Sequence, residues 1–242
     1  MPLCFLERVM VIKMKEPIRS IVKSLGADVC GIASIERFKD APSGFAPTDI
    51  YKDCKSVIAF GVALPKGTLE INPRLVYSHF NGDVKFARVD GIALLAAKQL
   101  EETFDLHAVP LPCDAPNEYW DAENLTAKGL ISMKHTAMMC GIGQLGKNTL
   151  LMNPTYGNRL CIGAILLNIA LESDPVCENL CLPNCHLCEE HCPVRAIEQG
   201  KVNQKLCRQN TYGKTARGFD TVDCNICRTI CPMKFGKNKD VQ

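Results

Sequence analysis

Cysteine spacing is the feature that most constrains what this chain can fold into. Of its fifteen cysteines, nine fall between Cys177 and Cys231. The pattern is C-x3-C-x2-C-x3-C-P from Cys181, then a separate Cys207, then C-x2-C-x3-C-P from Cys224. It is close to the bacterial run in which a C-x2-C pair binds one [4Fe–4S] cluster and the cysteine before proline binds the other. The segment is therefore expected to hold two clusters and to carry electrons.

The cysteines before proline divide the run between the two clusters. Proline fixes φ and ends a helix where the chain leaves a cluster, so each such cysteine is assigned to the cluster opposite its own C-x2-C pair. The first cluster is assigned Cys181, Cys185, Cys188 and Cys231, and the second is assigned Cys192, Cys207, Cys224 and Cys227. The run departs from the bacterial pattern in the longer Cys181–Cys185 spacing and in Thr221, which stands where a cysteine is usual. Cys177 remains an alternative ligand to Cys181.

Two other uses of cysteine fit the sequence less well. Structural zinc also takes C-x2-C pairs, with His186 and His191 available, but it needs neither eight thiolates nor two C-P endings. Disulfides are typical of small secreted chains, whereas this chain has 242 residues and an odd number of cysteines. The cysteines outside the run lie mostly among apolar residues and are expected to be buried small hydrophobic side chains: Cys4, Cys30, Cys54, Cys113, Cys140 and Cys161.

Composition indicates a globular chain. It is 47% hydrophobic and 22% charged with a net charge of +2, which predicts no general attraction to nucleic acid or to a membrane. The longest apolar run, residues 160–171, is too short to span a bilayer, and no signal peptide is expected. Free thiols and cluster ligands point to the cytoplasm. The basic residues of the cysteine segment are expected to form a solvated face: Lys201, Lys205, Arg208, Lys214 and Arg217.

Hydrophobic periodicity predicts an α+β chain. A helix from about residue 15 carries an apolar stripe from Ile18 to Leu25 and ends at Gly26. A long helix after Gly82 has one apolar face, made of Val89, Ile92, Ala93, Ala96 and Leu100. Strands are predicted over residues 29–35, 56–64, 148–152 and 160–167, and loops over 41–47 and 107–124. The expected domains are an extension over 1–14, an α/β domain over 15–172 and a cysteine module over 173–242.

The loop from Gly141 to Asn148 satisfies two nucleotide-binding patterns on paper, G-x-G-x-x-G and G-x-x-x-x-G-K. Both need a helix after the loop to hold phosphate, but here a strand is predicted, so nucleotide binding is not expected. Because glycine permits close backbone approach, the loop is instead predicted to contact a large redox cofactor through Gly141, Gly143, Gly146, Lys147 and Asn148. The alternative is a tight turn against the cysteine module.

Four segments ahead of the cysteine run resemble epoxyqueuosine reductase and its shorter relatives. They are residues 25–33, 54–61, 141–151 and 167–175, so the resemblance covers nearly the whole chain from about residue 15. It implies a nitroreductase-like α/β domain followed by a ferredoxin-like double [4Fe–4S] module. It also implies an iron–sulfur oxidoreductase that passes single electrons to a cofactor or substrate at the α/β domain. Cobalamin is the cofactor that the resemblance favours, with flavin second.

The resemblance also sets expectations for partners, namely an electron donor such as ferredoxin or flavodoxin and a small-molecule or cofactor substrate. Epoxyqueuosine reductase acts on tRNA. This chain ends soon after Pro232, without that enzyme's C-terminal extension, and the position of its acid falls near Ala127. The nearest carboxylates, Asp121 and Glu123, are expected to be surface acids, and His135 a structural or surface histidine. These differences make tRNA a doubtful substrate, and no catalytic residue is assigned. The alternative function is a non-catalytic electron carrier or a reductive activator of a partner protein.

Overall fold

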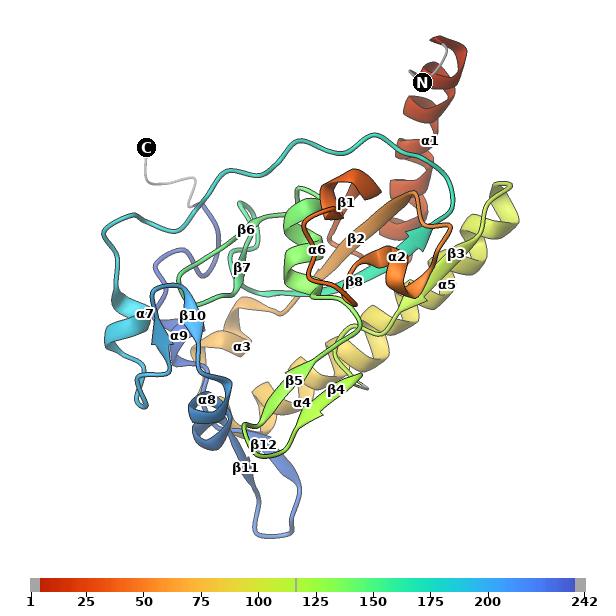
Figure 1. Ribbon diagram of the computed structural model, residues 1–242. Coiled ribbons are helices and arrows are strands. Elements are labelled where there is room, and N and C mark those ends of the chain that lie inside the picture. Colours follow the sequence, from red (N-terminus) through yellow and green to blue (C-terminus); the bar gives the residue numbers. More distant parts are fainter. Residues whose placement is uncertain (1–4, 116, 238–242) are drawn as a thin grey trace.

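The computed structural model describes residues 5–115 and 117–237. Its centre is a four-stranded antiparallel sheet in the order β1-β2-β8-β3 (Figure 1). The strands are β1 (Val29–Ser34), β2 (Ser56–Ala63), β8 (Leu160–Leu167) and β3 (Ala108–Leu111). The strands predicted at 29–35, 56–64 and 160–167 are confirmed.

Strand β8 lies in the middle of the molecule, with all eight residues buried. Successive side chains point to opposite faces of a strand, and here both faces are covered. Cys161, Ile165 and Leu167 belong to one core cluster, and Ile162 and Leu166 belong to the other. A strand that is buried on both faces is continuously apolar in sequence, which explains why residues 160–167 could be recognised.

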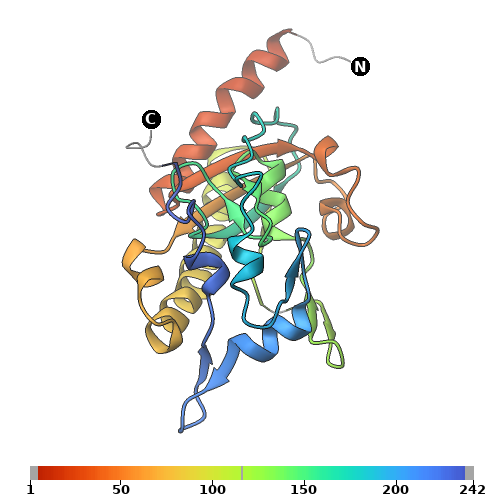
Figure 2. The same cartoon turned by 90° about the vertical axis from the view of Figure 1, so that its left-hand side faces the viewer.

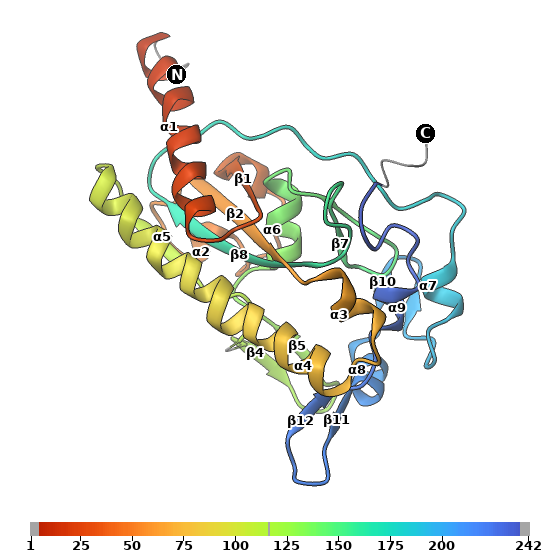
Figure 3. The same ribbon diagram turned by 180° about the vertical axis from the view of Figure 1, so that it is seen from behind.

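Helices α1 (Phe5–Ser24) and α5 (Asp90–Thr103) cover one face of the sheet (Figure 3). Ile18 and Val22 of α1 are fully buried, as the stripe predicted. The face predicted for α5 is buried as well. Helix α1 starts at Phe5, so residues 5–14 of the expected extension are helical.

The second helix starts earlier than the sequence suggested. Helix α4 (Arg74–Asp83) continues through a π-helical segment, η2 (Val84–Val89), directly into α5. Gly82 therefore lies inside a helix and not ahead of one. It is tolerated there because a glycine inside a helix costs only about 1 kcal/mol relative to alanine.

The opposite face of the sheet is covered by α6 (Met133–Met139) and by the loop that follows it. Two short strands, β6 (Gln144–Leu145) and β7 (Leu151–Met152), pair within this loop, so the strand predicted over 148–152 is shorter than expected.

The prediction of a loop over 107–124 was wrong in two places. It contains β3 at the edge of the sheet, where Pro110 is tolerated, and β4 (Tyr119–Asp121), which pairs with β5 (Thr126–Lys128).

The cysteine-rich segment lies at one end of the sheet (Figures 1 and 2). It contains α7 (Leu187–Glu190), β9 (Ile197–Glu198), β10 (Lys201–Val202), α8 (Gln204–Thr211), β11 (Tyr212–Lys214), β12 (Asp220–Val222) and α9 (Ile226–Thr229). The remaining short helices are η1 (Ile35–Phe38), α2 (Pro47–Ile50) and α3 (Lys66–Glu70). Within the part of the chain that the structure describes, no helix has the length and apolar character to cross a membrane.

Asp174 fastens the segment after β8 to the first strand and helix. Its Oδ2 accepts a hydrogen bond from the Ile32 backbone N–H at 2.8 Å, and its Oδ1 lies 2.6 Å from Lys15 Nζ. Arg19 donates to the same Oδ1. Burial on its own would raise the pKa of Asp174, but the hydrogen bonds from Arg19 and Lys15 hold that pKa below its usual value.

We predict that Asp174→Asn lowers the free energy of unfolding by about 1–3 kcal/mol at pH 7, because it leaves two cations without their carboxylate. The folded pKa lies below the unfolded value of about 3.9. The stabilisation is therefore complete above that value and is lost as the pH falls through the folded pKa. Urea unfolding at pH 7 and at pH 3 would measure it. Asp40→Asn, at an exposed turn, is the control, and equal midpoints for the two variants at pH 7 would contradict the prediction.

Candidate functional site

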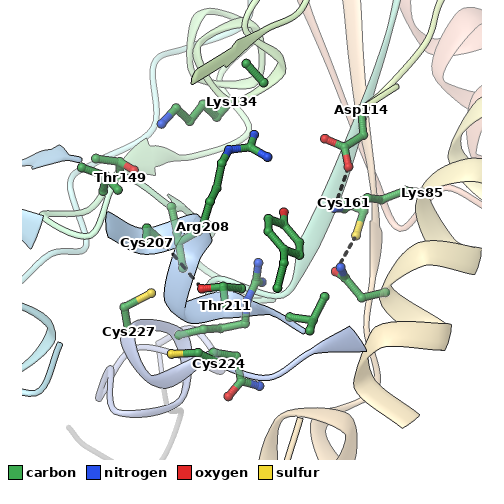
Figure 4. A pocket seen from close by; sticks show the side chains of 18 of the residues that line it. Lys85, Asp114, Lys134, Thr149, Cys161, Cys207, Arg208, Thr211, Cys224 and Cys227 are labelled. Atoms are coloured by element: carbon green, nitrogen blue, oxygen red, sulfur yellow. Dashed lines mark hydrogen bonds and ion pairs between the residues drawn. The ribbon is translucent and has the colours of Figure 1, made fainter. Parts of the chain in front are cut away.

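A cavity of about 760 Å³ lies between the sheet domain and the cysteine-rich segment (Figure 4). Sites that hold drug-sized ligands and cofactors occupy roughly 300–1,000 Å³, so this volume suits such a ligand. Its wall includes the four cysteines that the spacing assigns to the second cluster: Cys192, Cys207, Cys224 and Cys227.

Short local elements position these four thiols. Cys207 lies on α8, whose first turn is capped by Asn203, and its Sγ is 3.7 Å from Thr211 Oγ1. Cys192 Sγ accepts a hydrogen bond from the backbone N–H of Ala196 at 3.2 Å. Burial raises the pKa of Cys227 to about 11. A metal would deprotonate such a thiol on binding.

The other four predicted ligands gather around a second, smaller cavity. It is lined by Cys181, Cys185, Cys188 and Cys231 together with Gly146, Lys147 and Asn148. Cys177 is not among its lining residues, and its carbonyl accepts a hydrogen bond from Gln144 Nε2 at 2.9 Å. The fold thus groups the cysteines as their spacing does. Their role as ligands stays a prediction.

A buried amide nitrogen beside the second cysteine group lacks a hydrogen-bond partner in the part of the chain that the structure describes. The Asn225 side chain, between Cys224 and Cys227, is buried, and its Nδ2 has no partner among the described residues. A cluster sulfide would provide an acceptor for this donor. Residues 5–115 and 117–237 contain no group of three or more His, Cys, Asp or Glu side chains arranged to hold a metal ion, so the choice of clusters over zinc rests on the cysteine spacing.

The histidines and remaining cysteines are engaged elsewhere. His186 Nδ1 lies 2.7 Å from Glu189 Oε2, and His191 Nδ1 lies 3.0 Å from the Leu187 carbonyl. All the described cysteines are free thiols. Cys54, Cys140 and Cys161 are buried as expected, Cys30 and Cys113 are partly buried, and Cys4 lies outside the described residues.

The glycines of the 141–148 loop approach protein backbone. A Cβ on Gly141 would lie 2.3 Å from the Pro175 carbonyl oxygen, and a Cβ on Gly143 would lie 2.3 Å from that of Met152. Gly141 also has a φ of +75°, which favours glycine. Strand β7 follows the loop, so the helix that both nucleotide patterns require is missing from this position.

The polar end of the same loop is bonded to the cysteine segment. Lys147 Nζ donates to the carbonyls of Pro183 and Cys185, at 2.6 and 2.8 Å. Asn148 Nδ2 donates to the carbonyl of Cys227 at 2.8 Å. Of the five residues predicted to contact a cofactor, Asn148 lines the large cavity, whereas Gly141, Gly143, Gly146 and Lys147 are not among its lining residues. The geometry thus favours the tight turn against the cysteine module.

An ion pair between a partly buried lysine and an exposed carboxylate stands on the sheet side of the large cavity (Figure 4). Lys85 Nζ lies 2.8 Å from Asp114 Oδ2. Burial lowers the pKa of Lys85, but Asp114 outweighs it and holds that pKa above its usual value. The sequence analysis missed Asp114 because residues 107–124 were taken as a loop. Strand β3 ends three residues before Asp114, but its four residues, Ala-Val-Pro-Leu, show no alternation that could have revealed it.

The carboxylates considered from the sequence lie elsewhere. Asp121, at the end of β4, and Glu123, in the turn that follows, are exposed, and Asp121 Oδ1 accepts a hydrogen bond from the Glu123 backbone N–H at 3.0 Å. Ala127 lines the large cavity and brings no acid to it. His135 is exposed, with Nδ1 2.6 Å from Ser132 Oγ. Partial desolvation of its ring, together with the neighbouring Lys134 charge, lowers the pKa of His135.

Comparison with known proteins confirms the resemblance to epoxyqueuosine reductases. No family profile matches the chain. The epoxyqueuosine reductase of Bacillus subtilis is 26% identical over 259 residues, covering 94% of this chain and 65% of that protein. The chain spans 51% to 65% of the length of the first curated relatives it matches.

Two groups of solved structures share the fold. An epoxyqueuosine reductase with a tRNA-Tyr epoxyqueuosine-modified stem loop superposes with a TM-score of 0.64 at 19% identity, covering 94% of this chain and 67% of that chain. A reductive dehalogenase, described in terms of B12-dependent dehalogenation, superposes with a TM-score of 0.67 at 17% identity, covering 90% and 31%. The expectation that tRNA is a doubtful partner is therefore wrong, because a protein of this fold is solved with a tRNA stem loop.

We predict that Gly143→Ala destabilises the protein by about 1–3 kcal/mol, because the new methyl group meets a backbone oxygen that has no room to move. Displacing the loop should also loosen Lys147 and Asn148 from the cysteine segment and speed the loss of iron in air. Urea unfolding and timed iron analysis would measure both effects.

Gly82→Ala is the matched control for this substitution. Nothing lies within 4 Å of a Cβ at Gly82, so this change should be neutral or stabilise the helix by up to about 1 kcal/mol. If Gly143→Ala lost only cofactor binding, with stability and iron content unchanged, the loop would be a cofactor site after all.

Proposed function

We propose that this chain is an iron–sulfur oxidoreductase of the epoxyqueuosine-reductase type. The observation that carries the proposal is the position of Cys192, Cys207, Cys224 and Cys227 in the wall of the large cavity. Two [4Fe–4S] clusters, one on each group of four cysteines, would supply single electrons. A cluster held by the cavity-wall group would border any ligand in that space.

The chain's own residues define the environment of both cysteine groups. Asn148 lines both cavities and donates to the Cys227 carbonyl, so it stands between the two groups. Asn225 offers an uncommitted Nδ2 beside Cys224 and Cys227. Hydrogen bonds to cluster sulfurs and burial both influence the reduction potential, which gives these two amides a role in setting it.

For the cofactor in the large cavity we propose cobalamin, with a flavin as the second choice. The support is the resemblance to epoxyqueuosine reductases and the shared fold with a dehalogenase described as B12-dependent. The cavity volume is that of a cofactor-sized site. A non-catalytic electron carrier needs no such cavity, so that alternative is not favoured.

The substrate class that we propose is a modified base carried by tRNA. Curated relatives of this chain are named epoxyqueuosine reductase, and the solved enzyme of the same fold is bound to an epoxyqueuosine-modified stem loop. Two exposed aromatic side chains could stack on an unpaired base: Tyr212, which lines the cavity, and Trp120 of β4.

We predict about eight iron atoms and eight acid-labile sulfides per chain in protein prepared without oxygen, as two [4Fe–4S] clusters require. Cys192→Ala and Cys231→Ala should each remove about half of the iron by damaging different clusters. Iron and sulfide analysis, together with the visible absorbance, would measure this.

Cys177→Ala is the control for the two ligand variants and should keep its full iron content. Stoichiometric zinc without labile sulfide would contradict the cluster assignment. A Cys231→Ala protein that kept the cluster at Cys185 and Cys188 would show that the division of ligands is wrong.

We also predict that the anaerobic protein, supplied with cobalamin and a chemical reductant, converts an epoxyqueuosine-modified stem loop to the queuosine form. Mass spectrometry of the digested RNA would detect the loss of one oxygen atom. An unmodified stem loop is the control. Full iron content and cobalamin binding with no conversion would refute the tRNA substrate and leave the cluster assignment standing.

A further inference from the structure

Arg208 occupies an unusual position in the wall of the large cavity. The sequence analysis placed it on a solvated face, but it is half-buried and extends from α8 into the cavity (Figure 4). Its guanidinium carbon lies 5.3 Å from the centre of the Trp120 ring and 5.6 Å from that of the Tyr212 ring. Among the described residues it has no hydrogen-bond or ion-pair partner.

The two rings position the guanidinium without using its N–H groups. An aromatic ring attracts a cation through its electron-rich face and supplies no lone pair in the guanidinium plane. Arginine carries five N–H donors in a rigid planar fork that matches carboxylate and phosphate oxygens. Arg208 is thus held in place with its donors free to bind a ligand.

Lys134 brings a second cation to the same cavity from α6. It too has no hydrogen-bond or ion-pair partner within the described part of the chain. Burial lowers the pKa of Lys134, with no carboxylate to oppose that shift. An ammonium group in such a position is stabilised by an anion supplied from outside the protein.

The carboxylates in the cavity wall do not neutralise these two cations. Asp114 is paired with Lys85 at 2.8 Å, and Asp220 is paired with Lys214 at 2.6 Å. Arg228, another lining residue, donates to the Asn158 carbonyl. Arg208 and Lys134 therefore leave the wall with an excess of positive charge that faces the ligand space.

We propose that Arg208 and Lys134 form a binding site for an oxyanion group, a phosphate or a carboxylate, on the ligand that occupies the cavity. This inference depends on the proposed function in one respect, namely that the same cavity receives the substrate. Arg208 would bind two oxygens of the group through its planar fork. Lys134 would contribute a second positive charge, so ligands that carry no anionic group would bind more weakly.

The test is direct binding of two small oxyanions, inorganic phosphate and benzoate, to the anaerobic protein with its full iron content. Calorimetry at low ionic strength should show one saturable site per chain for at least one of them, and the one that binds identifies the source of the oxyanion. Arg208→Gln and Lys134→Met should each weaken binding about ten-fold or more, as loss of a charge-assisted hydrogen bond implies. Arg208→Lys keeps the charge but loses the fork and should also bind more weakly.

Two exposed cations outside the cavity provide matched controls, Arg217→Gln and Lys201→Met, which should bind like the unmodified protein. The proposal is overturned if neither anion binds at millimolar concentration, or if the cavity variants bind as tightly as the controls. It is also overturned if those variants shift only the reduction potential, because the cations would then merely offset cluster charge. The binding measurement needs neither reductant nor turnover, and iron content tests the proposed function in a separate experiment. Failure of one test can therefore be told apart from failure of the other.

Discussion

Two consecutive side chains hold the cysteine-rich segment against the sheet domain. Lys147 donates to the carbonyl of Cys185, in the first group of four cysteines, and Asn148 donates to that of Cys227, in the second. Both belong to a loop whose glycines lie against neighbouring backbone, Gly143 against that of Met152. This contact joins both cysteine groups to the sheet domain, together with the hydrogen bonds between Asn158 and Arg228.

The second cysteine group forms part of the wall of the large cavity. The cavity lies where the cysteine-rich segment meets the α4–η2 helix, the end of β3 and the start of α6. Each of these elements contributes a charged or polar side chain, among them Lys85, Asp114 and Lys134. A ligand in the cavity would thus contact the cysteine-bearing wall on one side and fixed charges on the other. This arrangement suits a reductase better than a protein that only carries electrons.

Local patterns in the sequence predicted much of this structure, and the failures involve contacts between distant residues. Cysteine spacing divided the cysteines as the fold groups them, because each C-x2-C pair is local and the known pattern places the cysteine before proline with the opposite pair. The buried strand at Leu160–Leu167 and the face from Val89 to Leu100 followed from periodicity. Strand β3 was missed because its partner β8 lies far along the chain and Pro110 resembles a loop residue. Arg208 was predicted to be solvated, because its aromatic neighbour Trp120 lies in the β4–β5 hairpin, far away in sequence.

Anomalous diffraction at the iron absorption edge, from crystals grown without oxygen, tests the central claim most directly. The account predicts two iron sites, one enclosed by Cys181, Cys185, Cys188 and Cys231 and the other by Cys192, Cys207, Cys224 and Cys227 at the wall of the large cavity. Iron at only one of these positions, or a signal at the zinc edge with none at the iron edge, would contradict it.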